Sequence, residues 1–147
     1  MRVPLAKVQG VDVGRVVKML LIHAIVEIDA GDSPIHGAPN QDQAVKEQRA
    51  AERLFGLLPS EPSKELADLW REFEDGQSGD ARFAKALDRF QPLLTNIFTG
   101  GGTWTESRVG YEQVLERYGP AIERGAPELW ALAREWVTSH FNREGST

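Results

Sequence analysis

The chain has 147 residues and is acidic, because 17 Lys and Arg against 22 Asp and Glu leave a formal net charge of −5 at pH 7. Hydrophobic residues make up 41% and charged residues 27%, a composition that is typical of a globular protein and excludes a disordered one. The absence of Cys excludes disulfides, thiolate nucleophiles and Cys-ligated metal sites. Only His23, His36 and His140 supply imidazoles, so a metal site would depend largely on carboxylates.

Charge and hydropathy also limit the partners and the location of the protein. The acidic balance, without any run of five Lys or Arg, argues against nucleic-acid binding. The longest apolar stretch, residues 19–26, is too short to cross a bilayer, and the N-terminus lacks the apolar core of a signal peptide. We therefore expect a single cytoplasmic domain over residues 1–147, with no membrane partner.

Apolar residues at helical spacing predict an all-α bundle. Its six helices are expected at about residues 12–29, 41–57, 62–75, 80–98, 105–118 and 127–142. The first is apolar nearly all round, which is typical of a buried central helix, with Asp12 as N-cap and Gly31 and Pro34 as stop signals. Pro92 predicts a kink in the fourth helix, and residues 100–102, three Gly in a row, predict a flexible loop.

His23 and Glu27 form the first candidate site. They are four residues apart, which places an imidazole and a carboxylate on one face of the first helix. In an apolar segment either group is costly to bury alone. The spacing fits a functional pair, and it equally fits a core histidine that bonds to a nearby glutamate.

Three further carboxylates are candidates. Asp29 and Asp32 end the first helix, either as ordinary turn residues or in a functional role, since acidic groups oppose the helix dipole there. Asp88 lies between Leu87 and Phe90 on an apolar helix, so a buried Asp88 would need a metal or a salt bridge to Lys85 or Arg89.

These pieces, in this order, resemble the HD-domain metal-dependent phosphohydrolases, and most closely the 5′-deoxynucleotidase-like branch. The matching text in and around the first helix is residues 11–12, 15–23, 27–28 and 30–32, and it continues with Lys46 and residues 57–59, 69–74 and 81–94. The resemblance covers about residues 11–140. It implies an HD-like helical fold and a phosphoric monoester hydrolase that acts on a nucleoside monophosphate.

The resemblance also assigns roles to single residues. His23 and Asp88 match metal ligands of the family, and Glu27 and Asp32 match acidic residues that position or activate the attacking water. Lys18 and Ser33 match positions near the substrate phosphate.

Two metal ligands of the family have no counterpart in this sequence. Ala24 stands in place of the Asp of the His-Asp pair, whether by natural loss or by engineering, and residues 1–10 hold no His of an upstream helix. An Ala methyl cannot coordinate a cation, so a divalent metal ion (Mn, Co, Ni, Zn or Mg) is expected to bind weakly or not at all. The sequence thus predicts an impaired enzyme.

Two alternatives to an impaired enzyme stay open. One is an inactive helical module that binds nucleotide or forms oligomers, and the other is a purely structural helical protein. Without the upstream helix, an apolar face around Val16, Leu20 and Leu21 would be exposed, and such a patch usually finds a partner. We therefore expect a homo-oligomer.

Overall fold

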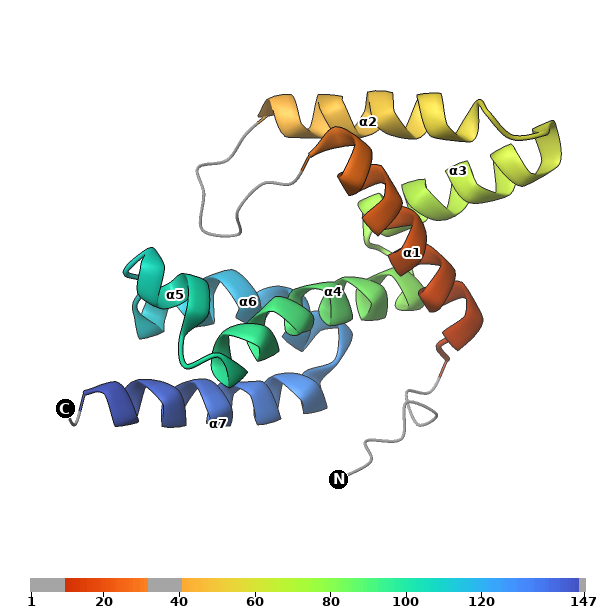
Figure 1. Cartoon of the computed structure of the whole chain (residues 1–147). Helices are drawn as coiled ribbons and strands as arrows, with labels where there is room; N and C mark the ends of the chain where they lie inside the picture. The colour runs from red at the N-terminus through yellow and green to blue at the C-terminus, as the bar shows by residue number, and fades with distance from the viewer. Residues whose placement is uncertain (1–9, 32–40, 146–147) are drawn as a thin grey trace. The chain divides into compact units, whose positions relative to one another are not determined.

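The structure, a computed structural model, describes residues 10–31 and 41–145. This part of the chain contains seven α-helices and no strand, which confirms the all-α class (Figure 1). The helices are α1 (Val13–Ala30), α2 (Gln41–Phe55), α3 (Ser60–Asp75), α4 (Gly79–Phe98), α5 (Gly102–Glu106), α6 (Tyr111–Gly125) and α7 (Pro127–Glu144). None of these helices is long and apolar enough to cross a membrane.

The chain divides into two compact units, Met1–Ala84 and Lys85–Thr147, with the boundary inside α4. The first unit holds α1, α2, α3 and the beginning of α4, and the second holds the rest of α4 with α5, α6 and α7. The single domain over residues 1–147 stays a prediction.

In the first unit, α1, α2 and α3 pack against one another (Figure 1). One side of α1 enters this core, and its members are Val16, Met19, Ile22 and Val26, none more than 6% exposed. The termini of α1 follow the predicted signals, since the Asp12 side chain accepts a hydrogen bond from the Arg15 backbone N–H and Gly31 adopts a φ of +84°. Helix boundaries read from these signals therefore agree with the structure to within a residue.

The prediction that α1 exposes an apolar face around Val16, Leu20 and Leu21 is only partly correct. Leu21 is 60% exposed, but Val16 is 2% exposed and belongs to the core. The exposed face of α1 is displaced around the helix from the predicted one, because α2 and α3 cover the side that carries Val16.

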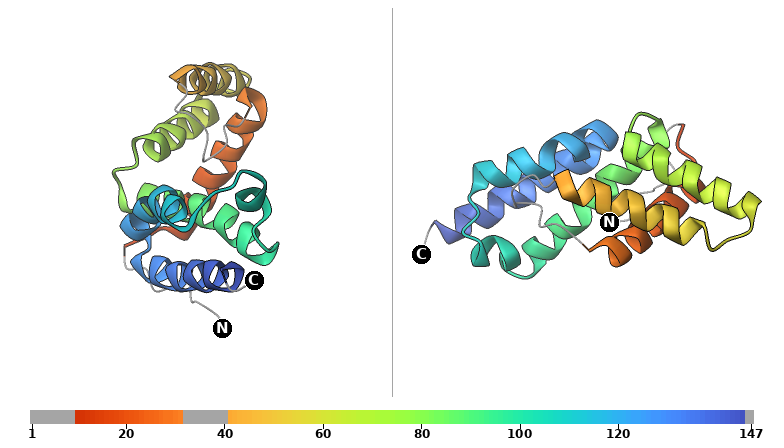
Figure 2. Two further views of the ribbon diagram at one scale, coloured as in Figure 1. Left: turned by 90° about the vertical axis from the view of Figure 1, so that its left-hand side faces the viewer. Right: turned by 90° about the horizontal axis from the view of Figure 1, so that it is seen from above.

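In the second unit, α6 and α7 lie side by side (Figures 1 and 2). Their contact is close at Gly119, where an added Cβ would lie 2.8 Å from Cζ2 of Trp130. Trp104 of α5 is 1% exposed, and its indole N–H donates to the Tyr118 hydroxyl at 3.2 Å. An aromatic core with small residues at the helix contact therefore holds this unit together.

The helix predicted at residues 105–118 is wrong, because two helices occupy this region. α5 ends before Arg108, whose φ of +53° is incompatible with a continuing helix, and α6 starts at Tyr111. α6 then continues through Pro120 to Gly125. Burial of Tyr118 and Ile122, at 1% and 0% exposure, outweighs the hydrogen bond that Pro120 cannot donate.

Candidate functional site

His23 and Glu27 lie together on α1, as their spacing predicts. His23 is 9% exposed, and its Nε2 lies 3.0 Å from Glu27 Oε1. The helix positions the pair, because residues four apart share one face. The Glu27 side chain is 31% exposed, so solvent can reach the carboxylate.

The sequence did not reveal the other contacts of His23, which come from α3. His23 Nδ1 lies 3.7 Å from Glu74 Oε1, and the ring centroids of His23 and Phe73 are 4.4 Å apart. Both ring nitrogens therefore face a carboxylate, and a neutral imidazole has an N–H for only one of them. The sequence pattern does not identify Glu74, because its contact with His23 depends on how α1 and α3 cross.

Ala24, which stands where the family pattern has Asp, is exposed on α1 next to His23. Its methyl group offers no donor atom to a cation. Among residues 10–31 and 41–145, no group of three or more His, Asp and Glu could hold a metal ion. The described residues therefore do not fit the four-ligand metal shell that the resemblance implies, although His23 and Glu27 are part of the matching pattern.

Asp88 belongs to the second unit, and it is exposed rather than buried as expected. The buried side of α4 carries Phe83, Ala86 and Leu93, with exposures of 3%, 0% and 0%. Asp88 is two residues from Ala86, which turns it to the other side of the helix. Its role as a metal ligand beside His23 stays a prediction.

Of the other predicted site residues, Asp32 and Ser33 lie outside the described residues. Lys18 is described, and its Nζ lies 2.9 Å from Glu65 Oε1 of α3, with both side chains more than half exposed. A phosphate would therefore compete with Glu65 for Lys18, but such an exposed ion pair holds only weakly.

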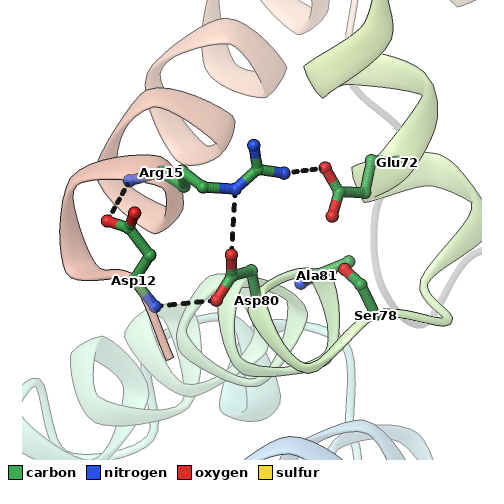
Figure 3. Close-up of polar contacts among 6 residues, drawn as sticks. All are labelled: Asp12, Arg15, Glu72, Ser78, Asp80 and Ala81. Atoms are coloured by element: carbon green, nitrogen blue, oxygen red, sulfur yellow. Dashed lines mark hydrogen bonds and ion pairs between the residues drawn. The ribbon is translucent and has the colours of Figure 1, made fainter. Parts of the chain in front are cut away.

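A network around Arg15 fixes α3 against α1 (Figure 3). Arg15 Nε donates to Asp80 Oδ2 at 3.0 Å, the guanidinium also pairs with Glu72, and the Asp12 backbone N–H donates to Asp80 Oδ1 at 2.9 Å. The hydrogen bonds to Asp80 and then to Glu72 raise the pKa of Arg15 above its already high usual value. Because Glu72 and Glu74 share α3, this network also helps to place Glu74 beside His23.

Basic side chains of α2 face the C-terminal end of α1. Lys46, Arg49 and Arg53 line a surface pocket of about 240 Å³ together with Asp29 and Ala30. Arg53 pairs with Asp29, and the charges of Lys46 and Arg49 leave the pocket lining with a net positive charge. Ala30 is three residues beyond Glu27, which puts the pocket along the same face of α1 as the His23–Glu27 pair. This geometry suits an anionic ligand near that pair.

Comparisons with known proteins bear on the family and the fold of the chain. A family model described as HD domain matches residues 1–130. The chain is 48% identical to a predicted metal-dependent phosphohydrolase from Magnetospirillum magnetotacticum MS-1, whose crystal structure it matches with a TM-score of 0.83 over 92% of this chain and 69% of that chain.

Curated relatives match a shorter segment. The chain is 36% identical over 81 residues to 5′-deoxynucleotidase HDDC2 of Bos taurus and 35% identical over 81 residues to that of Homo sapiens. Each match covers 54% of this chain and 40% of the relative.

The helical fold and the pair on α1 define an HD-type helical protein similar to phosphohydrolases. The chain belongs to the HD domain family.

Proposed function

We propose that this chain is a phosphohydrolase of the 5′-deoxynucleotidase type with an impaired metal site, and that its substrate is a nucleoside monophosphate. The observation that carries the proposal is the contact of the buried His23 with the partly exposed Glu27 on α1 of an HD domain. The names of the curated relatives support this choice of substrate class.

Glu27 is the proposed catalytic carboxylate of this site. As a carboxylate it can accept a proton from water, and its partial exposure lets water approach. His23 fixes its position through the 3.0 Å contact. Asp32 is proposed to act beside it, and Lys18 and Ser33 to contact the substrate phosphate.

The pocket lined by α2 supports an anionic substrate. Lys46 and Arg49 add positive charge one turn of α1 beyond Glu27, and positive charge raises the local concentration of a phosphate ester. The net positive charge of the pocket is small, since Arg53 is already paired with Asp29. The pocket would therefore contribute more to substrate capture than to the chemical step.

Ala24 is the proposed cause of the impairment. The described residues offer no complete set of metal ligands, and Ala24 stands where the family pattern supplies a carboxylate. A divalent cation (Mn, Co, Ni, Zn or Mg) would thus be held weakly or not at all.

The second candidate is an inactive module that binds nucleotide without hydrolysing it. The specific observation in its favour is that both ring nitrogens of His23 face carboxylates, so a cation would have to displace one of them. The pocket lined by α2 could still receive a phosphate in such a protein.

A phosphatase assay on nucleoside monophosphates, with each divalent metal in turn, separates the two candidates. We expect slow hydrolysis that His23→Ala and Glu27→Gln abolish and that Glu116→Gln, an exposed carboxylate of α6, leaves unchanged. Hydrolysis equal in Glu27→Gln and the parent protein would refute the proposed role of Glu27. Thermal stabilisation by nucleotide without any turnover would favour the inactive module.

A further inference from the structure

α1 carries a continuous apolar face that the rest of the described chain leaves uncovered. We call it the α1 stripe, and its large members are Val13, Val17, Leu21, Ile25 and Ile28, which are 45%, 49%, 60%, 53% and 84% exposed. Their spacing of three or four residues places them in one band along the helix, opposite the side packed on α2 and α3. No charged residue interrupts the band.

We propose that a second copy of this chain covers the α1 stripe, by antiparallel packing of α1 against α1 around a two-fold axis near Leu21. This interaction goes beyond the proposed function and does not depend on it.

The symmetry of the stripe supports a second copy as the partner. Val17 and Ile25 lie four residues on either side of Leu21, and Val13 and Ile28 lie eight and seven residues from it. In an antiparallel pair, Leu21 therefore meets Leu21, Val17 meets Ile25, and Val13 meets Ile28. Such self-complementarity is what a two-fold interface requires.

The charges at the edge of the stripe favour the antiparallel direction. Lys18 and Asp29 are eleven residues, or three helical turns, apart and so lie on the same edge of α1. Antiparallel packing puts these two edges side by side and brings Lys18 of one copy toward Asp29 of the other, whereas parallel packing around a two-fold axis places them on opposite sides of the interface. Both residues also have partners within their own copy, Glu65 and Arg53, so their contribution is to direction more than to affinity.

The area of the stripe is sufficient for a modest dimer. Five such side chains expose on the order of 500 Å², so a pair of copies would bury on the order of 1,000 Å², near the lower limit for a specific interface. Ala24 lies within the band, and its small side chain lets the two helices approach closely. The dimer is therefore expected to dissociate on dilution.

Analytical ultracentrifugation over a dilution series tests the interface with matched variants. Leu21→Asp places two like charges at the axis and should weaken dimerisation at least about tenfold. Leu57→Asp, the same change at a residue that is 73% exposed and off α1, should leave it unchanged. A parent protein that stays monomeric at every concentration, or a dimer equally stable in Leu21→Asp, would overturn the proposal. Circular dichroism verifies that both variants fold.

The register can be tested because the chain has no native Cys. We expect Leu21→Cys to cross-link with itself under oxidation, and a mixture of Val13→Cys and Ile28→Cys to give the mixed product. Val13→Cys alone should give none. Efficient cross-linking of Val13→Cys with itself would show parallel packing and contradict the proposed geometry.

Discussion

Among the described residues, each of the two units buries one histidine, and the two histidines have different surroundings. His23 on α1 has carboxylates at both ring nitrogens, 3.0 Å away at Glu27 and 3.7 Å away at Glu74. The centroid of the His140 ring lies 5.7 Å from that of Trp104 and 5.1 Å from that of Phe141, and His140 Nε2 lies 3.8 Å from Oε1 of the half-exposed Glu144. Both histidines are thus buried, at 9% and 5% exposure, but carboxylates face both ring nitrogens of His23, whereas aromatic rings supply most of the surroundings of His140.

This difference shows why burial alone does not identify a functional histidine. An imidazole among aromatic rings contributes packing, while an imidazole between carboxylates can exchange protons or hold a cation. The first unit also exposes the α1 stripe, whereas the second covers its small helix contact at Gly119 with Trp130. The His23–Glu27 pair of the proposed function and the α1 stripe of the proposed dimer therefore both lie in the first unit.

The largest expected effect is on stability, and it distinguishes replacement of His140 from replacement of His23. His140→Ala should lower the free energy of unfolding by about 2–4 kcal/mol, since it removes a large buried side chain. It should leave nucleotide binding intact at temperatures where the variant is folded. His23→Ala should have the smaller effect on stability and the larger one on the slow hydrolysis proposed above. Chemical denaturation and a phosphatase assay measure the two effects, and the opposite order would contradict the comparison.

The next effect concerns glycine in the two units. Gly119→Ala should cost about 1–3 kcal/mol, because its Cβ would lie 2.8 Å from Trp130 Cζ2 at the contact of α6 with α7. Gly14→Ala in α1 meets only Asp12 Oδ1 at 3.3 Å and should be neutral or slightly stabilising. Thermal unfolding of both variants is the measurement. A Gly119→Ala protein as stable as the parent would refute the close packing.

The smallest effect concerns the Arg15 network of the first unit. Arg15→Gln should cost about 1 kcal/mol or less, because the Arg15 side chain is 42% exposed although Asp80 is only 14% exposed. The destabilisation caused by Arg15→Gln should decrease as the salt concentration rises. Lys64→Gln, which breaks an exposed pair with Asp68, serves as the control and should cost less. Equal costs in both variants would show that the network adds nothing.

Much of the fold could be predicted from the sequence. The helical period and the caps gave α1 from Asp12 to Gly31 almost to the residue, because these signals are local. The division into α5 and α6 was missed, since it depends on a positive φ at Arg108 and on burial that carries α6 past Pro120. Tertiary packing decided both.

The candidate site was less predictable than the fold. The spacing of His23 and Glu27 predicted their contact, because both lie on one helix. Glu74 and the α2 cations were not predicted as site residues, since crossings of separate helices bring them to α1. The apolar period placed Asp88 in the core wrongly, as the buried side of α4 follows Phe83, Ala86 and Leu93.

The metal affinity of Ala24→Asp tests our proposal that α1 keeps an HD-type site without the carboxylate at position 24. Calorimetric titration with Mn²⁺ or Co²⁺ should give weak or no binding for the parent protein and for Ala24→Asn. Ala24→Asp should bind at least about tenfold more tightly. Because Ala24 lies in the α1 stripe, the oligomeric state of each variant is measured alongside. Tight stoichiometric binding by the parent protein, or equal affinities of Ala24→Asp and Ala24→Asn, would contradict the proposal.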